Sequence, residues 1–249
     1  MIKSFEIDSA KRIILKIGSS LLIENKKFNY NWLESFIDDV IILKRKKIEI
    51  IIVASGAVSL GEAYLKIKNK KISITDKQAL AACGQVILME NFMKAFIKRK
   101  IKVAQILLTF SDTEDRRKSL NSRETLKSLL KGGVVPIINE NDTVATDELK
   151  FGDNDRLASR VAQIIDADLL ILLSDVKGLY DDNPKTNKEA KLIPIVKNIN
   201  SKSLDITSHQ TNEFGSGGMR TKIEAAEIAD SFGCNTIICQ GNLKKPISN

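Results

Sequence analysis

The chain is poor in the residues that carry thiol and imidazole chemistry. Its 249 residues include three cysteines, and their spacing matches no zinc pattern. So few scattered cysteines argue against a disulfide framework, and the simplest interpretation is a reduced, cytoplasmic protein. A single histidine, His209, excludes histidine triads and histidine metal clusters.

Long apolar runs and aromatic residues are also scarce. No apolar run approaches the ~20 residues of a membrane-spanning helix, and the N-terminus lacks the apolar core of a signal peptide. Aromatic residues make up 5% of the chain, and the lysines behind its net charge of +8 are spread over every segment. A nucleic-acid surface concentrates basic residues on one face, often between aromatics. We therefore expect no nucleic-acid or membrane partner. The net charge by itself suggests RNA binding as an alternative. The same positive charge is compatible with a polyanionic substrate such as a nucleotide.

The residues that are present follow an alternating strand and helix pattern. The chain is 43% hydrophobic and 28% charged, which is typical of a globular protein. Buried-strand patterns occupy Arg12–Ile17, Ile48–Ala54, Ile101–Leu108, Val134–Ile138, Asp168–Leu173 and Thr236–Cys239. Helical patterns occupy Tyr30–Lys46, Ala57–Tyr64, a stretch from Thr75 or Asp76 to Lys98, Asp112–Lys131, a stretch from Asp153 or Asn154 to Asp166, and Met219–Phe232. This alternation predicts an α/β fold with a largely parallel sheet and helices on both faces.

Polar turns follow several of these strands or open the helices. They are Gly18–Ser20, Ser55–Ala57, Gly152–Asp155 and Gly215–Gly218. Glycine lets backbone N–H groups approach an anion, and a helix N-terminus adds a favourable dipole. Four such turns at one edge of a parallel sheet indicate a site for a phosphorylated ligand. The chain has neither GxxxxGK[ST] nor GxGxxG after a strand, so a P-loop or Rossmann site is poorly supported.

The stretch Pro136–Arg156 carries six carboxylates directly after a predicted strand. Its position at the carboxyl edge of the sheet favours a binding site. The alternative is a solvated acidic loop, and Asp147 and Glu148 keep that interpretation. Asp155 is either an ordinary carboxylate at a helix N-terminus or a group that orients cations.

Two lysines stand apart from the surface set. Lys16 lies inside an apolar strand, either as a solvent-facing strand end or as a cation aimed at a phosphate. Lys222 lies in the first turn of a predicted helix, where a cation is disfavoured unless an anion binds there. Asp175 ends the fifth strand, where a nucleotide could bind.

Seven motifs give the chain a family resemblance from Arg12 to about Gly241. They are LKIGSSLL, ASGAVSLG, EDRRKSLNSRETL, VPIINENDTVAT, FGDNDRLA, SDVKGLYDDNP and GSGGMRTKIEAA. With these motifs the chain resembles the amino acid kinase family. The pair INEND and GDND is similar to the members that phosphorylate glutamate, rather than acetylglutamate, carbamate, aspartate or uridylate. The resemblance implies a three-layer α/β/α sandwich with a central, mainly parallel sheet, as one kinase domain over residues 1–249.

The resemblance also implies an activity. ATP, with Mg²⁺, would phosphorylate the γ-carboxylate of L-glutamate to give γ-glutamyl phosphate and ADP, the first step of proline biosynthesis. Lys16, Lys222 and Asp155 would be the catalytic residues, with Asp155 orienting both lysines. Glutamate would be bound by Ser55, Asp142 and Asn154. The expected ATP-binding residues are Lys16, Gly18, Ser174, Asp175, Ser216, Gly217, Gly218, Met219, Arg220, Thr221 and Lys222. No metal ligand from the protein is predicted.

The sequence departs from the family pattern in several places, among them the segment Ser201–Phe214 and Ser216, where threonine is usual. Ser174 stands where threonine is usual, which retains the hydroxyl, and Arg220 stands where alanine or serine is usual. Many bacterial members carry a C-terminal RNA-modification-type (PUA) domain, which we expect to be absent because the sequence stops at Asn249. The resemblance implies a homo-oligomer, a dimer or tetramer, with proline as a feedback inhibitor. Alternatives are a kinase for another acid, such as acetylglutamate, and a non-catalytic amino-acid or nucleotide sensor.

Overall fold

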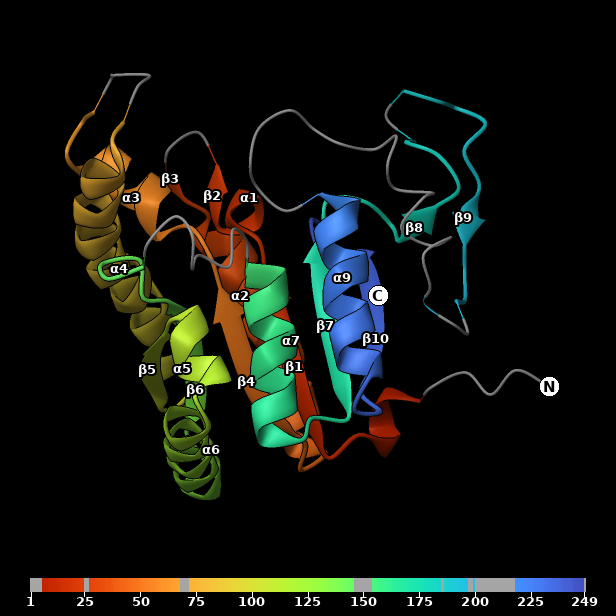
Figure 1. Ribbon diagram of the computed structural model, residues 1–249, viewed down its shortest axis with the longest axis horizontal. Helices are drawn as coiled ribbons and strands as arrows, with labels where there is room; N and C mark the ends of the chain where they lie inside the picture. Colours follow the sequence, from red (N-terminus) through yellow and green to blue (C-terminus); the bar gives the residue numbers. More distant parts are fainter. Residues whose placement is uncertain are drawn as a thin grey trace.

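A six-stranded parallel sheet forms the centre of the molecule (Figure 1). The computed structural model describes residues 6–24, 27–67, 72–145, 154–184, 186–196, 199 and 218–248. The sheet has the order β10-β7-β1-β4-β6-β5, and each of its pairings is parallel. Its strands are β1 (Arg12–Ile17), β4 (Glu49–Ala54), β5 (Val103–Leu108), β6 (Val135–Glu140), β7 (Leu169–Ser174) and β10 (Asn235–Gln240). The predicted parallel sheet is confirmed.

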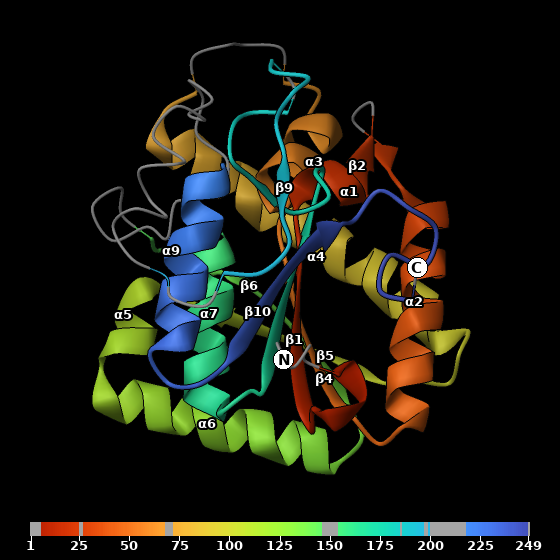
Figure 2. The ribbon, with the colours of Figure 1, turned by 90° about the vertical axis from the view of Figure 1, so that its right-hand side faces the viewer.

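Helices cover both faces of the sheet, which makes three layers (Figure 2). One face carries α1 (Ser19–Leu22), α2 (Tyr30–Arg45), α3 (Ala57–Tyr64) and α4 (Ile74–Ile97). The other carries α5 (Phe110–Glu114), α6 (Arg116–Lys131), α7 (Asn154–Ile165) and α9 (Met219–Asp230). Alternate residues of β1 enter the two cores: Ile13 and Leu15 pack toward α2 and α4, whereas Ile14 packs toward α7. This alternation explains why the whole strand is apolar.

The strand order creates a switch point between β1 and β7. The chain leaves β1 through α1 and α2 toward β4, and it leaves β7 toward α9 and β10 on the opposite face. Ile17 at the end of β1 lies level with Ala54 of β4 and Leu173 of β7. In open α/β sheets, ligands bind beyond the carboxyl ends of the strands at such a point.

Two helices differ from the sequence prediction in how they are capped or divided. The N-cap of α4 is Ser73 rather than Thr75 or Asp76, because Ser73 and Asp76 form a reciprocal capping box. The helix predicted over Asp112–Lys131 is two helices, α5 and α6. Asp115 has an extended backbone, with ψ of 122°, and its side chain accepts a hydrogen bond from the Lys118 N–H. A strong N-cap inside the polar stretch therefore starts a new helix.

Short elements that the sequence pattern does not reveal extend beyond the sheet. A 3₁₀ turn, η1 (Ile7–Ser9), precedes β1. Two antiparallel ladders pair β2 (Ile23–Glu24) with β3 (Lys27–Phe28), and β8 (Leu179–Tyr180) with β9 (Leu192–Ile193). Each strand has only two residues, too few to show periodicity.

Helices α3 and α4 touch through their backbones. A Cβ atom on Gly84 of α4 would lie 1.7 Å from the carbonyl oxygen of Ala57, and one on Gly61 of α3 would lie 2.0 Å from that of Leu80. Only glycine permits this approach. Helix α4 is long and apolar enough to cross a membrane, but it also packs Leu88, with neighbouring apolar residues, into the core. We therefore interpret it as a core helix.

Candidate functional site

Buried polar side chains gather at the carboxyl edge of the sheet. They come from the ends of β1, β6 and β7, from the first turns of α7 and α9, and from α4. They are Lys16, Gln85, Asn139, Glu140, Asn154, Asp155, Ser174 and Lys222. Buried polar groups need partners, so this gathering marks a built site rather than a surface loop.

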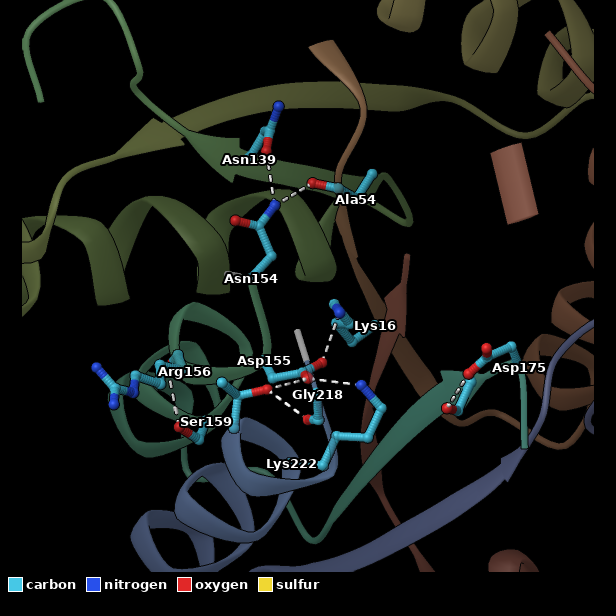
Figure 3. A network of polar contacts seen from close by, with 12 residues as sticks. Lys16, Ala54, Asn139, Asn154, Asp155, Arg156, Ser159, Asp175, Gly218 and Lys222 are labelled. Atoms are coloured by element: carbon cyan, nitrogen blue, oxygen red, sulfur yellow. Dashed lines mark hydrogen bonds and ion pairs between the residues drawn. The ribbon is translucent and has the colours of Figure 1, made fainter. Parts of the chain in front are cut away.

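Asp155 lies between the two lysines that the sequence singles out (Figure 3). Its Oδ1 is 2.5 Å from the Lys16 Nζ atom of β1, and its Oδ2 is 2.8 Å from the Lys222 Nζ atom of α9. The Thr221 hydroxyl also donates to Oδ2, at 3.2 Å. The Asp155 side chain is fully buried, and the side chains of Lys16 and Lys222 are 5% and 7% exposed, respectively. The structure therefore brings the three expected catalytic residues together.

The electrostatics of the triad favour a carboxylate over a carboxylic acid. Burial by itself raises the pKa of Asp155, but the charges of Lys16 and Lys222 and their hydrogen bonds outweigh this effect. The pKa of Asp155 is thus lowered from its usual value. The triad holds two cations against one anion, which leaves an excess positive charge within these three residues.

Side-chain amides line the adjoining part of the site (Figure 3). Asn154 precedes Asp155 in the first turn of α7. Its Nδ2 donates to the Asn139 Oδ1, at 2.7 Å, and to the carbonyl oxygen of Ala54 at the end of β4. The Asn139 Nδ2 in turn donates to the Gln85 Oε1 of α4, at 2.8 Å. One chain of hydrogen bonds therefore links α7, β6 and α4.

The other predicted glutamate-binding residues lie at the same edge. Ser55 follows Ala54 and is half-buried, and Gly56 after it has φ of 110°, which favours glycine. Asp142 lies in the turn after β6, three residues beyond Asn139, and is half-exposed. Asp153 and Gly152 lie outside the described residues, as does His209.

The described residues among those predicted to bind ATP lie near the ends of β1 and β7 and at the starts of α1 and α9. Gly18 is the N-cap of α1, and Gly218 is the N-cap of α9 and has no capping side chain. Ser174 at the end of β7 is buried, whereas Asp175 beside it is exposed. Ser216 and Gly217 lie outside the described residues.

The predicted ATP-binding residues in the first turn of α9 differ in how far they are exposed to solvent. Lys222 is buried, Thr221 and Met219 are half-buried, and Arg220 is exposed. The Arg220 Nε donates to Glu224, at 3.0 Å. Arg220 is thus held on the surface of α9, and the binding roles of all these residues stay predictions.

Sequence reasoning missed two of the interactions that build the site. One is Gln85, whose signal is its place on the apolar face of α4, three residues before Leu88. The other is Glu224 of α9, which accepts from both Arg156 and Arg220. Arg156 directly follows Asp155, so this surface ion pair ties α7 to α9 beside the triad.

A metal would find few ligands here. Within the part of the chain that the structure describes, no group of three or more histidine, cysteine, aspartate or glutamate side chains could hold a metal ion. The three cysteines are free thiols. Burial, followed by a nearby carboxylate, raises the pKa of Cys234 to about 12 and that of Cys239 to about 11, so neither favours the thiolate that binds metals.

Comparison with known proteins gives relatives of known name. The chain is 50% identical over 242 residues to the glutamate 5-kinase of Pelagibacter ubique, covering 97% of this chain and 66% of that protein. It is 46% identical over 238 residues to the glutamate 5-kinase of Allorhizobium ampelinum, covering 95% of this chain and 61% of that protein. The chain thus spans slightly less than two thirds of the length of these relatives.

Solved structures and a family model agree on the fold. The isopentenyl phosphate kinase of T. acidophilum superposes with a TM-score of 0.65 at 17% identity, covering 93% of this chain and 92% of that chain. A Giardia lamblia carbamate kinase bound to AMP-PNP gives a TM-score of 0.65 at 15% identity, covering 95% and 94%. The model of the amino acid kinase family matches residues 11–240. The chain belongs to the amino acid kinase family.

Proposed function

We propose that this chain transfers the γ-phosphoryl group of ATP to the γ-carboxylate of L-glutamate. The products are γ-glutamyl phosphate and ADP, and the reaction is the first step of proline biosynthesis. The observation that carries the proposal is the buried Lys16–Asp155–Lys222 triad, joined through Asn154 to a cluster of amides. The names of the glutamate 5-kinase relatives support the choice of acid.

The acceptor requires no general base. A free glutamate side chain has a pKa of about 4.3 and is already ionised at neutral pH. The absence of histidine from the described site is therefore compatible with the reaction. The difficulty lies in bringing two anions together and in stabilising charge on the transferring phosphoryl group.

The two lysines address that difficulty. Lys16 and Lys222 approach from different elements, β1 and α9, and Asp155 holds both ammonium groups in place. A preorganised cation in a buried site stabilises developing negative charge far better than a solvated one. The N-terminus of α9, with Gly218 as its N-cap, adds backbone N–H groups on the same side.

Magnesium would arrive with the nucleotide. Mg²⁺ retains several water molecules and binds through phosphates and one or two carboxylates. Asp155 is already engaged with both lysines, so it is a poor metal ligand. When bound to ATP, Mg²⁺ would neutralise phosphate charge.

A coupled assay of ADP release tests the proposal. Turnover is expected with L-glutamate and not with N-acetylglutamate, which lacks the free ammonium group. Preference for N-acetylglutamate would favour the other acid kinase. Calorimetric binding of glutamate and ATP without turnover would favour the sensor. A salt-dependent RNA shift would revive the nucleic-acid alternative.

Assembly and regulation belong to the same proposal. We propose a homo-oligomer, a dimer or tetramer, in the cytoplasm, in which residues 1–249 fold as one kinase domain and proline inhibits the kinase. Val86, Met93 and Ile97 support assembly, because they leave 69%, 53% and 68% of their area exposed at helical spacing on α4. Analytical ultracentrifugation of the wild type and of Met93→Lys tests the oligomer, and titration of turnover with L-proline tests inhibition.

A further inference from the structure

Helix α4 delivers one polar side chain to the edge of the site. Gln85 leaves only 8% of its area exposed. Gly84 directly before it lies against the backbone of α3, and this contact brings Gln85 close enough to reach Asn139 of β6. Gln85 therefore approaches the site from a helix that carries none of the predicted site residues.

Two backbone groups fix the orientation of the amides. The carbonyl oxygen of Ala54 can only accept a hydrogen bond, so Asn154 must present its Nδ2 there. The N–H of Glu140 can only donate, so Asn139 must present its Oδ1, at 2.9 Å. The Asn139 Nδ2 then faces Gln85, which must offer Oε1. These two backbone groups therefore determine which end of each of the three amides is the oxygen and which is the nitrogen.

The result is a defined chemical face on Asn154. Its Nδ2 donates twice, to the oxygens of Ala54 and Asn139, so both N–H groups are used. Its Oδ1 points away from both partners (Figure 3). Asn154 therefore presents an acceptor, which suits an ammonium group and not a carboxylate.

Gln85 is also buried in a way that stability does not explain. Within the part of the chain that the structure describes, its Nε2 has no hydrogen-bond partner. A buried N–H group without a partner destabilises a fold, so a glutamine at this position calls for another reason.

We propose that Gln85 is a positioning residue for the amino-acid substrate. Its Oε1 accepts from the Asn139 Nδ2 and so anchors the amide whose Oδ1 faces the Glu140 N–H. Asn139 in turn holds Asn154 with its oxygen toward the substrate ammonium group. The inference rests on the proposed function for the identity of that substrate. Gln85 acts through Asn139 and Asn154 and has no part in the transfer of the phosphoryl group.

Replacement of Gln85 by methionine is the first test. Gln85→Met retains the volume and removes the acceptor, so the Asn139 Nδ2 loses its partner and the Asn139 side chain is held less firmly. The KM for glutamate is expected to rise about ten-fold, whereas kcat and the KM for ATP change less than about two-fold. The Tm should stay within about 4 °C of wild type, because the unpartnered Nε2 is removed as well. An unchanged KM for glutamate, or an equal rise for both substrates, would overturn the proposal.

Matched variants separate positioning from packing. Gln85→Glu keeps an acceptor oxygen and is expected to leave the KM for glutamate within about three-fold of wild type. Leu88→Met changes core packing one turn along α4 and should alter neither KM. In an Asn139→Ala background the Gln85→Met effect should vanish, because the middle of the chain of amides is missing. A full effect in that background would mean that Gln85 acts by another route.

Calorimetry distinguishes failure of this inference from failure of the proposed function. Glutamate is titrated into wild type and Gln85→Met, so that binding is measured without turnover. Wild type that binds glutamate but does not phosphorylate it would overturn the proposed reaction, while a ten-fold weaker binding by the variant would still support the role of Gln85. Wild type that neither binds nor phosphorylates glutamate would overturn both.

Discussion

The site has an ionic half and an amide half, and the two are built on different physical principles. The ionic half is Lys16, Asp155 and Lys222, and the amide half is Gln85, Asn139 and Asn154. Buried charges need a partner of opposite sign, but their attraction depends little on the direction from which the partner approaches. Neutral amides need no counter-charge, but an exchange of oxygen and nitrogen reverses what they recognise.

This difference predicts two kinds of failure. Loss of the Asp155 charge leaves two buried lysines without their carboxylate, so it should damage both the fold and the chemical step. Loss of an acceptor from the amide half should change recognition of the amino acid more than the chemical step. A single peptide bond, between Asn154 and Asp155, joins the two halves.

The largest effect is expected from Asp155→Asn. The substitution leaves two buried lysines without their carboxylate, so the free energy of unfolding should fall by about 3–5 kcal/mol. The kcat should fall about 1,000-fold, since both cations lose their position. Urea denaturation and steady-state kinetics measure the two quantities. Asp166→Asn is the matched control at the other end of α7, where 65% of the side chain is exposed, and it should cost less than about 1 kcal/mol. Equal losses in the two variants would remove the distinction between a buried and an exposed carboxylate.

Lys222→Met should affect the chemical step more than it affects the binding of glutamate. The variant keeps the apolar stem of the side chain and removes the cation. The kcat should fall about 100-fold to 1,000-fold, with the KM for glutamate nearly unchanged. Lys127→Met, at a largely exposed ion pair of α6, serves as the control and should behave as wild type. An unchanged kcat in Lys222→Met would take this lysine out of the phosphoryl site.

Asn154→Ala should show the opposite pattern. It removes the acceptor that ends the chain of amides, so the KM for glutamate should rise about 10-fold to 100-fold. The KM for ATP should change little, because the triad retains all of its charges. Initial rates with each substrate varied in turn measure both constants. A larger effect on ATP than on glutamate would assign Asn154 to the wrong half.

Acid should weaken the ionic half at a defined pH. Because the pKa of Asp155 is lowered in the folded protein, its contribution is fully present above about pH 4 and is lost as the pH falls through the lowered value. The stability difference between wild type and Asp155→Asn should therefore be constant from pH 7 to pH 5. Below about pH 4 it should narrow, by at most about 1.4 kcal/mol for each further drop of one in pH. Denaturation curves at pH 7, 5, 4 and 3 measure this, and narrowing already above pH 5 would imply a raised pKa.

The smallest effect is expected outside both halves. Arg156→Ala removes the ion pair with Glu224, in which 45% of the arginine side chain is exposed. An exposed pair of this kind contributes less than about 1 kcal/mol, and kcat should stay within about two-fold of wild type. Thermal unfolding and the coupled assay are sufficient. A loss of kcat as large as that of Lys222→Met would make the surface tie between α7 and α9 part of the ionic half.

The ionic half could be predicted from the sequence because local pattern determines where its members lie. Lys16 lies one residue before the end of β1, whereas Asp155 and Lys222 lie in the first turns of α7 and α9. Ends of parallel strands meet at one edge, so the three residues had to come close. Their convergence is confirmed by the two ion pairs.

The amide half could be predicted only in part. Asn154 and Asn139 stand in visible motifs, but Gln85 depends on how α4 crosses α3, and a helical pattern does not encode that crossing. The break at Asp115 was missed for a related reason, since helix propensity alone does not show which of several acidic residues becomes a cap. Ser216 and Gly217 lie outside the described residues, so their predicted contact with ATP stays a prediction.

The glycine contact between α3 and α4 has a genetic consequence. Any missense change at Gly84 adds at least a Cβ atom, which would lie 1.7 Å from a backbone oxygen. Even alanine, the mildest replacement, is therefore excluded unless the two helices separate. In a saturation library, position 84 should therefore tolerate no substitution and would resemble a catalytic position. The side chain of glycine is a single hydrogen atom, so this intolerance would come from packing alone. Position 85 beside it should tolerate several replacements for folding and few for activity, so neighbouring codons would be constrained for different reasons.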